Sequence, residues 1–329
     1  MATLAEIAKR AGVTPAVVSR IVNRDQTLRV AKQTRERVEK IIAELDYAPN
    51  VAAQSLRSSK SGTLAFILHD VSNPVYGRIL QGAQTEASRQ GLAILLGDAA
   101  VGAESNTRLA KMIAGRGVDG VILQSAGDLS EEILVRSARK DTPVVLLQHR
   151  LDVDASLIML PDRAAAQLAM QHLRGLGHAR IGCLATLQGL TMTTARLEGW
   201  RAAMDGNADE DAVAYAPSHS KGGHEVASAL LARRPDLTAL LCFNVVAAVG
   251  ALRAARAAGL AVPRDLSVIA IHDAPFAGDL AVPLTVVDMP LQELGALAVQ
   301  AAVAAETVTK TIGTPPALIE RESTTAPRR

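Results

Sequence analysis

Three short stretches near the start of the chain place apolar residues at helical spacing. The stripes are positions 4, 7, 8 and 11, then 17, 18 and 21, then 38, 41, 42 and 45. Thr3 and Glu6 form a capping box before the first stripe, and Gly12 ends it. Thr14 can cap the second helix, with Pro15 at its first position. The pattern predicts three helices, the third covering roughly residues 32–45.

From residue 63 onward, short apolar runs alternate with stretches of helical period. The runs predict strands at 64–68, 93–96, 121–123, 144–147, 157–160, 181–184, 239–242 and 267–271. Helical stretches between them include 75–89, 106–114, 164–173 and 247–258. This alternation is typical of parallel α/β sheets, and the number of strands indicates two of them. Ligand sites in such folds lie beyond the carboxyl ends of the strands.

Residues 58–62, Ser-Ser-Lys-Ser-Gly, form a flexible tether between these two parts. We therefore predict a small all-α domain over residues 1–60 and a larger α/β domain over 61–329. The small domain has eleven Lys and Arg against six acidic residues, a net charge of +5, within a chain whose total is +2. A basic module on a mildly acidic body favours a polyanionic partner for the module.

Several classes of protein are disfavoured. No run of about 18 apolar residues could span a membrane, and residues 1–10 contain no apolar stretch typical of a secretion signal. Cys183 and Cys242 lie in apolar runs, as expected of reduced, buried thiols in a cytoplasmic protein. His172 and His178 have no metal-ligand partner set and suit a surface helix end. No Ser-His-Asp arrangement stands out, so neither an enzyme nor a cofactor is expected.

Residues 115–120, Gly-Arg-Gly-Val-Asp-Gly, match a dinucleotide-binding pattern. That motif requires a strand before it and a helix after it, because the helix N-terminus holds the pyrophosphate. Here the predicted helix comes first and the strand follows. The segment is therefore interpreted as a helix-to-strand loop, which disfavours a dehydrogenase.

Two short helices joined by a Gly-containing turn, with a third behind them, predict a helix-turn-helix. A three-helix scaffold without nucleic acid is the alternative. Residues 3–8, 11–14, 18–23, 34–35 and 45–50 resemble the DNA-binding headpiece of the lactose-repressor (LacI) family in order and spacing. The resemblance implies DNA contacts by Thr14, Pro15, Ala16, Ser19, Arg20, Asn23 and Thr34.

Within that set, Arg20 can bond N7 and O6 of a guanine, whereas Ala16 offers only apolar contact to a thymine methyl. Ser19, Asn23 and Thr34 would bond phosphates and position the domain. The resemblance also implies that the segment from Asn50 to Arg57 is a hinge helix that orders on operator DNA. Leu56 would then be its minor-groove wedge.

The body resembles the periplasmic-binding-protein-like core of the same family. The matching stretches are residues 73–76, 117–120, 176–182, 196–200, 259–269, 283–287 and 318–323. The resemblance implies two lobes joined by three crossovers, with an effector between them. The first lobe would comprise about 63–160 and 289–312, and the second about 161–288 and 313–329. A periplasmic solute-binding protein shares this body, but it has an export signal and no headpiece.

The family's effector contacts carry over to Tyr76, His149, Arg163, Arg196, Asn244 and His272. Val245 and His272 stand where the family commonly has Asp, so two acidic acceptors are lost and basic groups are gained. Forked Arg donors bind oxyanions well. We therefore expect an anionic effector such as a sugar acid or other carboxylate, with a neutral sugar as the alternative. The expected partners are pseudo-palindromic double-stranded operator DNA, the effector and a second copy of the chain, with a tetramer possible.

Overall fold

A computed structural model of the chain describes residues 2–22, 25, 27–47, 60–125, 127, 129–204, 206, 208–304 and 306–328. The chain divides into two compact units, Met1–Ser61 and Gly62–Arg329. The expected hinge helix, with Asn50, Leu56 and Arg57, lies outside the described residues, as does Asn23.

The first unit contains the three expected helices, α1 (Leu4–Ala11), α2 (Pro15–Val22) and α3 (Lys32–Glu44), packed on a small apolar core. The Glu6 amide donates to Thr3 Oγ1 at 3.2 Å, as the capping box predicts. Gly12 ends α1 in the left-handed region at φ 64°, where a side chain would be strained. A capping box also pairs the Glu6 carboxylate with the Thr3 amide. Here that carboxylate accepts instead from Arg10, one turn later, and forms an ion pair with it.

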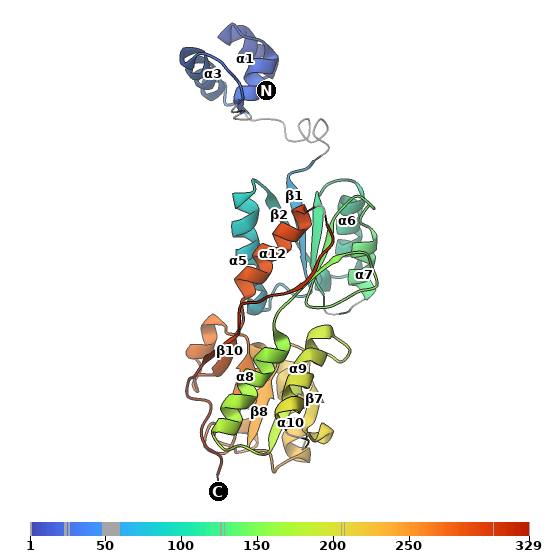
Figure 1. The fold of residues 1–329 in the computed structure, drawn as a ribbon, viewed down its shortest axis with the longest axis vertical. Coiled ribbons are helices and arrows are strands. Elements are labelled where there is room, and N and C mark those ends of the chain that lie inside the picture. The colour runs from blue at the N-terminus through green and yellow to red at the C-terminus, as the bar shows by residue number, and fades with distance from the viewer. Residues whose placement is uncertain are drawn as a thin grey trace. The chain divides into compact units, whose positions relative to one another are not determined.

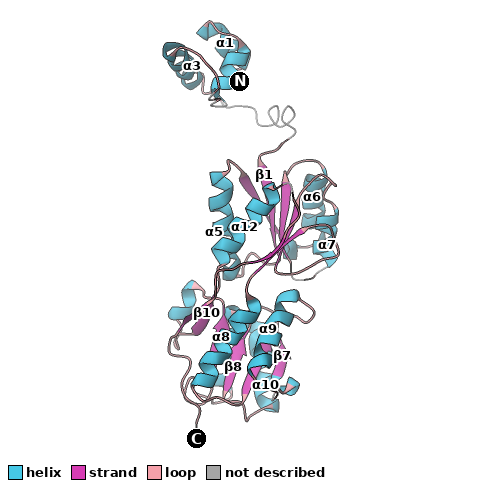
Figure 2. Ribbon diagram, in the orientation of Figure 1, coloured by secondary structure: helices cyan, strands magenta, loops and turns pink. Residues whose placement is uncertain are grey.

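The second unit contains two six-stranded sheets, confirming the predicted fold class (Figures 1 and 2). The first sheet has the order β11-β5-β4-β3-β1-β2, and the second has β12-β10-β9-β8-β6-β7. All strand pairs are parallel except β10 with β12. The strands are β1 (Thr63–Leu68), β2 (Ala93–Asp98), β3 (Gly120–Gln124), β4 (Val144–Leu147), β5 (Ser156–Met159), β6 (Ile181–Ala185), β7 (Val213–Tyr215), β8 (Ala239–Cys242), β9 (Ser267–Ile271), β10 (Thr285–Asp288), β11 (Thr309–Thr311) and β12 (Ala317–Ile319).

Helices cover both faces of the sheets because alternate strand residues are apolar on each face. On the first sheet, α5 and α12 pack over Phe66 and Ile122, while α6 and α7 cover the face of Ile67 and Leu123. The helices are α5 (Pro74–Arg89), α6 (Ala103–Ala114), α7 (Leu129–Arg136), α8 (Asp162–Gly175), α9 (Thr191–Ala203), α10 (Ser220–Arg233), α11 (Val245–Ala257) and α12 (Leu291–Val303), with 3-10 turns η1 (Ala99–Val101), η2 (Glu210–Ala212) and η3 (Pro275–Gly278).

The chain passes between the two sheets three times, so each lobe is built from separate stretches of sequence (Figure 1). The crossings join β5 to α8, β10 to α12, and β11 to β12. The Gly115–Gly120 segment runs from the C-cap of α6 to the first residue of β3, which confirms that it connects a helix to a strand.

Three helix pairs approach closely at glycines. A Cβ built on Gly295 of α12 would lie 1.9 Å from the Ile79 carbonyl oxygen of α5. A Cβ built on Gly223 of α10 would lie 2.2 Å from the Ala247 carbonyl oxygen of α11. A Cβ built on Gly199 of α9 would lie 2.5 Å from the Arg163 carbonyl oxygen of α8. Backbone-to-backbone contact therefore sets the spacing of these helices.

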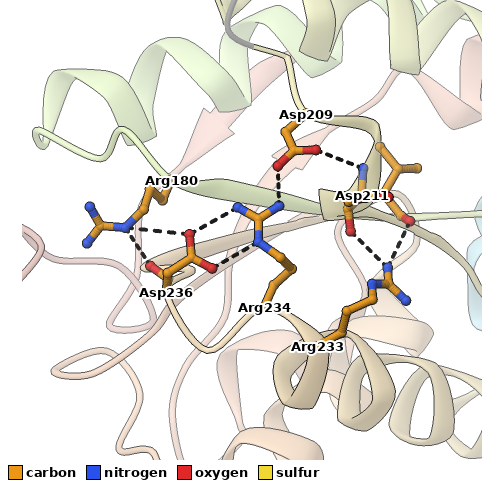
Figure 3. A network of polar contacts seen from close by, with 7 residues as sticks. Arg180, Asp209, Asp211, Arg233, Arg234 and Asp236 are labelled. Carbon is orange, nitrogen blue, oxygen red and sulfur yellow. Dashed lines mark hydrogen bonds and ion pairs between the residues drawn. The ribbon is translucent and has the colours of Figure 1, made fainter.

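In the second lobe, ion pairs and hydrogen bonds connect the segments that lead into β6, β7 and β8 at their amino ends (Figure 3). Arg234 donates to both carboxylate oxygens of Asp236, at 2.9 and 3.0 Å, and also to Asp209. Arg180, just before β6, donates to the Asp236 carbonyl oxygen at 2.7 Å. Ligand sites in open α/β sheets lie at the other, carboxyl ends of strands, so we interpret this network as structural.

The position of His178 in the second unit corrects the expectation of a histidine at an exposed helix end. His178 is 3 % exposed and contacts Thr238, Ser267 and Thr325, so it anchors the C-terminal segment and is not at a surface helix end. Cys183 and Cys242 are free and buried, as expected. Among the described residues, no helix is long and apolar enough to cross a membrane, and no cluster of His, Cys, Asp or Glu could hold a metal ion.

Candidate functional site

The exposed face of α2 is the candidate nucleic-acid surface of the first unit. Thr14, Pro15, Ala16 and Arg20 are exposed, because the apolar stripe of α2 turns Val18 and Ile21 into the core. Ser19 and Thr34 are partly exposed on α2 and α3.

Sequence reasoning missed the residues that orient Arg20. Its Nε donates to Asp25 Oδ2 at 2.7 Å, and its NH2 group donates to Thr27 Oγ1 at 2.8 Å. Hydrogen bonds from Thr27 and Arg20 lower the pKa of Asp25 to about 2. Asp25 is therefore ionised at neutral pH and holds the guanidinium in place on the exposed helix.

The second unit contains a cavity of about 120 Å³ lined by both lobes. Four of the six expected effector residues line it: Tyr76, Arg196, Asn244 and His272. Sequence reasoning missed the eight other polar lining residues, which are His69, Asp70, Asn73, Gln124, Gln148, Thr186, Ser218 and His219. Most of these follow the carboxyl ends of strands, so the rule that ligands bind there could have found them.

Arg196 is the buried centre of one cavity wall. It is 1 % exposed, and its Nε donates to Asp162 Oδ1 at 2.7 Å. NH1 donates to the Phe243 carbonyl oxygen, and NH2 donates to His272 Nε2 at 2.9 Å. The Gly199 contact described above brings α9, which carries Arg196, against α8, which begins with Asp162. The guanidinium thus joins the start of α8 to the ends of β8 and β9.

The protonation state of His272 follows from this geometry. Burial and the neighbouring Arg196 hold the pKa of His272 well below its usual range, so the ring is neutral. Because Arg196 donates to Nε2, the ring proton resides on Nδ1, which has no hydrogen-bond partner among the described residues. Its backbone is left-handed at φ 73°, an uncommon conformation outside glycine that is enriched at functional sites.

These contacts correct the expectation of a cationic cavity. Asp162 neutralises Arg196, and His272 carries no charge. Arg163 lines a different cavity beside the β5–α8 crossing. His149 does not line the main cavity: its Nδ1 accepts from the Thr191 amide of the other lobe at 3.2 Å. Asp70 adds a carboxylate to the lining, so the grounds for an anionic effector are lost.

The lowered histidine pKa values predict a pH dependence of stability. Burial lowers the pKa of His149, His172, His178 and His272. Below pH about 6.5 the unfolded chain therefore binds more protons than the folded one, and folding stability falls as pH falls. We expect the urea midpoint of the second unit to decrease between pH 7.5 and 5.5. A midpoint that rises on acidification would contradict this assignment.

Comparisons with known proteins agree with this architecture. Residues 61–320 match the family model of periplasmic binding proteins and the sugar-binding domain of the LacI family, and residues 3–50 match that of bacterial regulatory proteins of the lacI family. The chain is 34 % identical to the HTH-type transcriptional regulator MalR of Streptomyces coelicolor over 90 % of this chain and 88 % of that protein.

Two solved structures are similar over almost the whole chain. The lac repressor dimer bound to operator and the anti-inducer ONPF has a TM-score of 0.84 and 26 % identity, covering 99 % of both chains. The transcriptional regulator CelR in complex with cellobiose has a TM-score of 0.73 and 28 % identity, covering 98 % of this chain and 100 % of that one. The helix-turn-helix, the two-lobed core and the matches along both identify the chain as a member of the LacI family, DNA-binding transcriptional repressors controlled by an effector.

Proposed function

We propose that this protein represses transcription as a homodimer on a pseudo-palindromic operator, and that a small neutral, oxygen-rich molecule changes its operator affinity. The observation that carries the effector class is the Asp162–Arg196–His272 arrangement, which leaves this wall without net charge. A buried anion would need cationic donors that are not already paired. The relative solved with cellobiose has a neutral sugar as its ligand.

The proposed homodimer draws support from an apolar groove on the second lobe. Val249 and Leu252 of α11 line it together with Leu280 and Val282, and the groove encloses about 370 Å³. These four side chains are only partly buried, and apolar surface left accessible in this way is typical of protein interfaces. The lac repressor structure named above is likewise a dimer on operator. A two-fold protein fits a two-fold operator with one α2 in each half-site.

The experiment that tests the function is selection of bound duplexes from a random DNA pool by the full-length protein. The outcome expected is one enriched pseudo-palindrome, whose binding then changes when a neutral sugar panel is added. Enrichment of no sequence, or equal affinity for selected and random duplexes, would overturn the proposal.

Base recognition by Arg20 gives a sharper prediction. Arg20→Ala should weaken operator binding by about 1–3 kcal/mol and relax one position in each half-site, because the side chain supplies a forked donor to a guanine. Arg10→Ala is the matched control: it also removes one exposed cation paired with a carboxylate, but from α1. A repeated selection that still shows the same base preference with Arg20→Ala would refute the role.

A further inference from the structure

We propose that Asp25 and Thr27 are positioning residues for base recognition. They hold the Arg20 guanidinium by one edge, so that its end edge is left to read two adjacent acceptors of one base. The inference rests on the proposed function only in taking Arg20 as the residue that contacts bases. It follows from a closed ring of hydrogen bonds between α2 and the segment that comes after it.

Asp25 accepts hydrogen bonds with both of its carboxylate oxygens. Its Oδ1 accepts from the Thr27 amide at 2.8 Å and from the Thr27 hydroxyl at 2.7 Å, as in a turn closed by an Asp side chain. Its Oδ2 accepts from Arg20 Nε at 2.7 Å. The Asp25 amide also donates to the Arg20 carbonyl oxygen at 2.9 Å. The carboxylate is therefore fixed relative to α2.

Thr27 completes the ring with its hydroxyl group. Its Oγ1 accepts from Arg20 Nη2 at 2.8 Å, while its proton is donated to Asp25. Arg20 is thus held along the edge formed by Nε and Nη2. The N–H groups of Nη1 and the second N–H of Nη2 are left over, and they have no hydrogen-bond partner among the described residues. One N–H from each of these nitrogens makes a pair of parallel donors on the end edge.

The free end edge matches a base that offers two acceptors side by side. In the major groove guanine does so with N7 and O6, whereas adenine places a donor beside its acceptor. A side chain that is already held also loses less conformational entropy when it binds. Asp25 and Thr27 therefore strengthen the preference of Arg20 for guanine without contacting the base themselves.

The same ion pair weakens attraction to DNA of any sequence. Hydrogen bonds from Thr27 and Arg20 lower the pKa of Asp25 to about 2, so the carboxylate is charged and offsets the charge of Arg20. Binding that ignores sequence depends on cations that neutralise phosphates. Loss of the carboxylate should therefore raise the affinity for random duplex while it lowers the preference for guanine. A change that only disturbed the fold would lower both.

Asp25→Asn tests the proposal in the full-length protein. Asn still forms the turn, because its Oδ1 accepts from the Thr27 amide, but its NH2 group places a donor against the Nε–H of Arg20. Affinity is measured for the selected operator duplex, for the same duplex with the recognised guanine replaced by adenine, and for random duplex. The guanine preference should fall by about two- to tenfold, as expected for one side chain that is no longer held. The affinity for random duplex should rise.

Three further variants separate positioning from charge and from shape. Glu6→Gln removes a carboxylate from the exposed ion pair with Arg10 on α1, so it should raise the affinity for random duplex and leave the guanine preference unchanged. Thr27→Val keeps the shape of the side chain but removes the acceptor of Arg20 Nη2, and it should lower the guanine preference. Thr27→Ser keeps the hydroxyl group and should retain the preference.

The inference is overturned if Asp25→Asn keeps the guanine preference, if it weakens binding to every duplex equally, or if Thr27→Val and Thr27→Ser behave alike. Arg20→Ala is measured in parallel. Loss of the preference in Arg20→Ala but not in Asp25→Asn contradicts the positioning role alone. An unchanged preference in Arg20→Ala contradicts the base contact of the proposed function instead, so the two failures are distinguishable.

Discussion

Arg196→Ala should destabilise the second unit by about 3–5 kcal/mol, because it leaves the buried Asp162 carboxylate without its partner. The Phe243 carbonyl oxygen and His272 Nε2 lose donors at the same time. Trp200, the only tryptophan, is fully buried one turn further along α9 and reports unfolding by fluorescence. Urea unfolding at pH 7.5 measures the effect. The substitution is thus not a simple test of effector binding.

Removing both charges provides the control for this prediction. Replacing a buried ion pair by apolar residues of similar size is often close to neutral, since no unpaired charge remains. The double variant Arg196→Met with Asp162→Leu should therefore recover most of the stability that Arg196→Ala loses. If Arg196→Ala unfolds at the same urea concentration as the unmodified protein, the pair does not hold the lobe together.

Gly295→Ala should cost about 1–3 kcal/mol or more, because its Cβ would lie 1.9 Å from the Ile79 oxygen and 2.7 Å from the Ala83 amide nitrogen. The clash is with backbone, so α5 and α12 must separate to relieve it. Gly77→Ala on α5 is the matched control: apart from the backbone of α5 itself and the two chain neighbours, nothing lies within 4 Å of its added methyl. It should gain about 0.5–1 kcal/mol from helix propensity. Thermal unfolding that ranks the two variants the other way would contradict the close approach.

The candidate site was predictable only in part. Tyr76, Arg196, Asn244 and His272 were found from the resemblance, and the cavity does bring them together. Its charge was not predictable, because Asp162 lies 34 positions before Arg196 and is paired with it only by the packing of α8 on α9.

Local structure was determined by the sequence itself. The cap at Thr3, the turn at Gly12 and the start of α2 at Pro15 depend on a few neighbouring residues, so local chemistry is sufficient for them. The long apolar runs such as β1 and β9 likewise specify buried strands. In contrast, β11 (Thr309–Thr311) is polar and exposed throughout, and it is a strand only because β5 offers an edge for it to pair with. Only the tertiary structure decided that β11 is a strand, that Asp162 is the partner of Arg196, and that the His149 ring contacts Thr191 outside the main cavity. Each of these features depends on contacts between residues far apart in the chain.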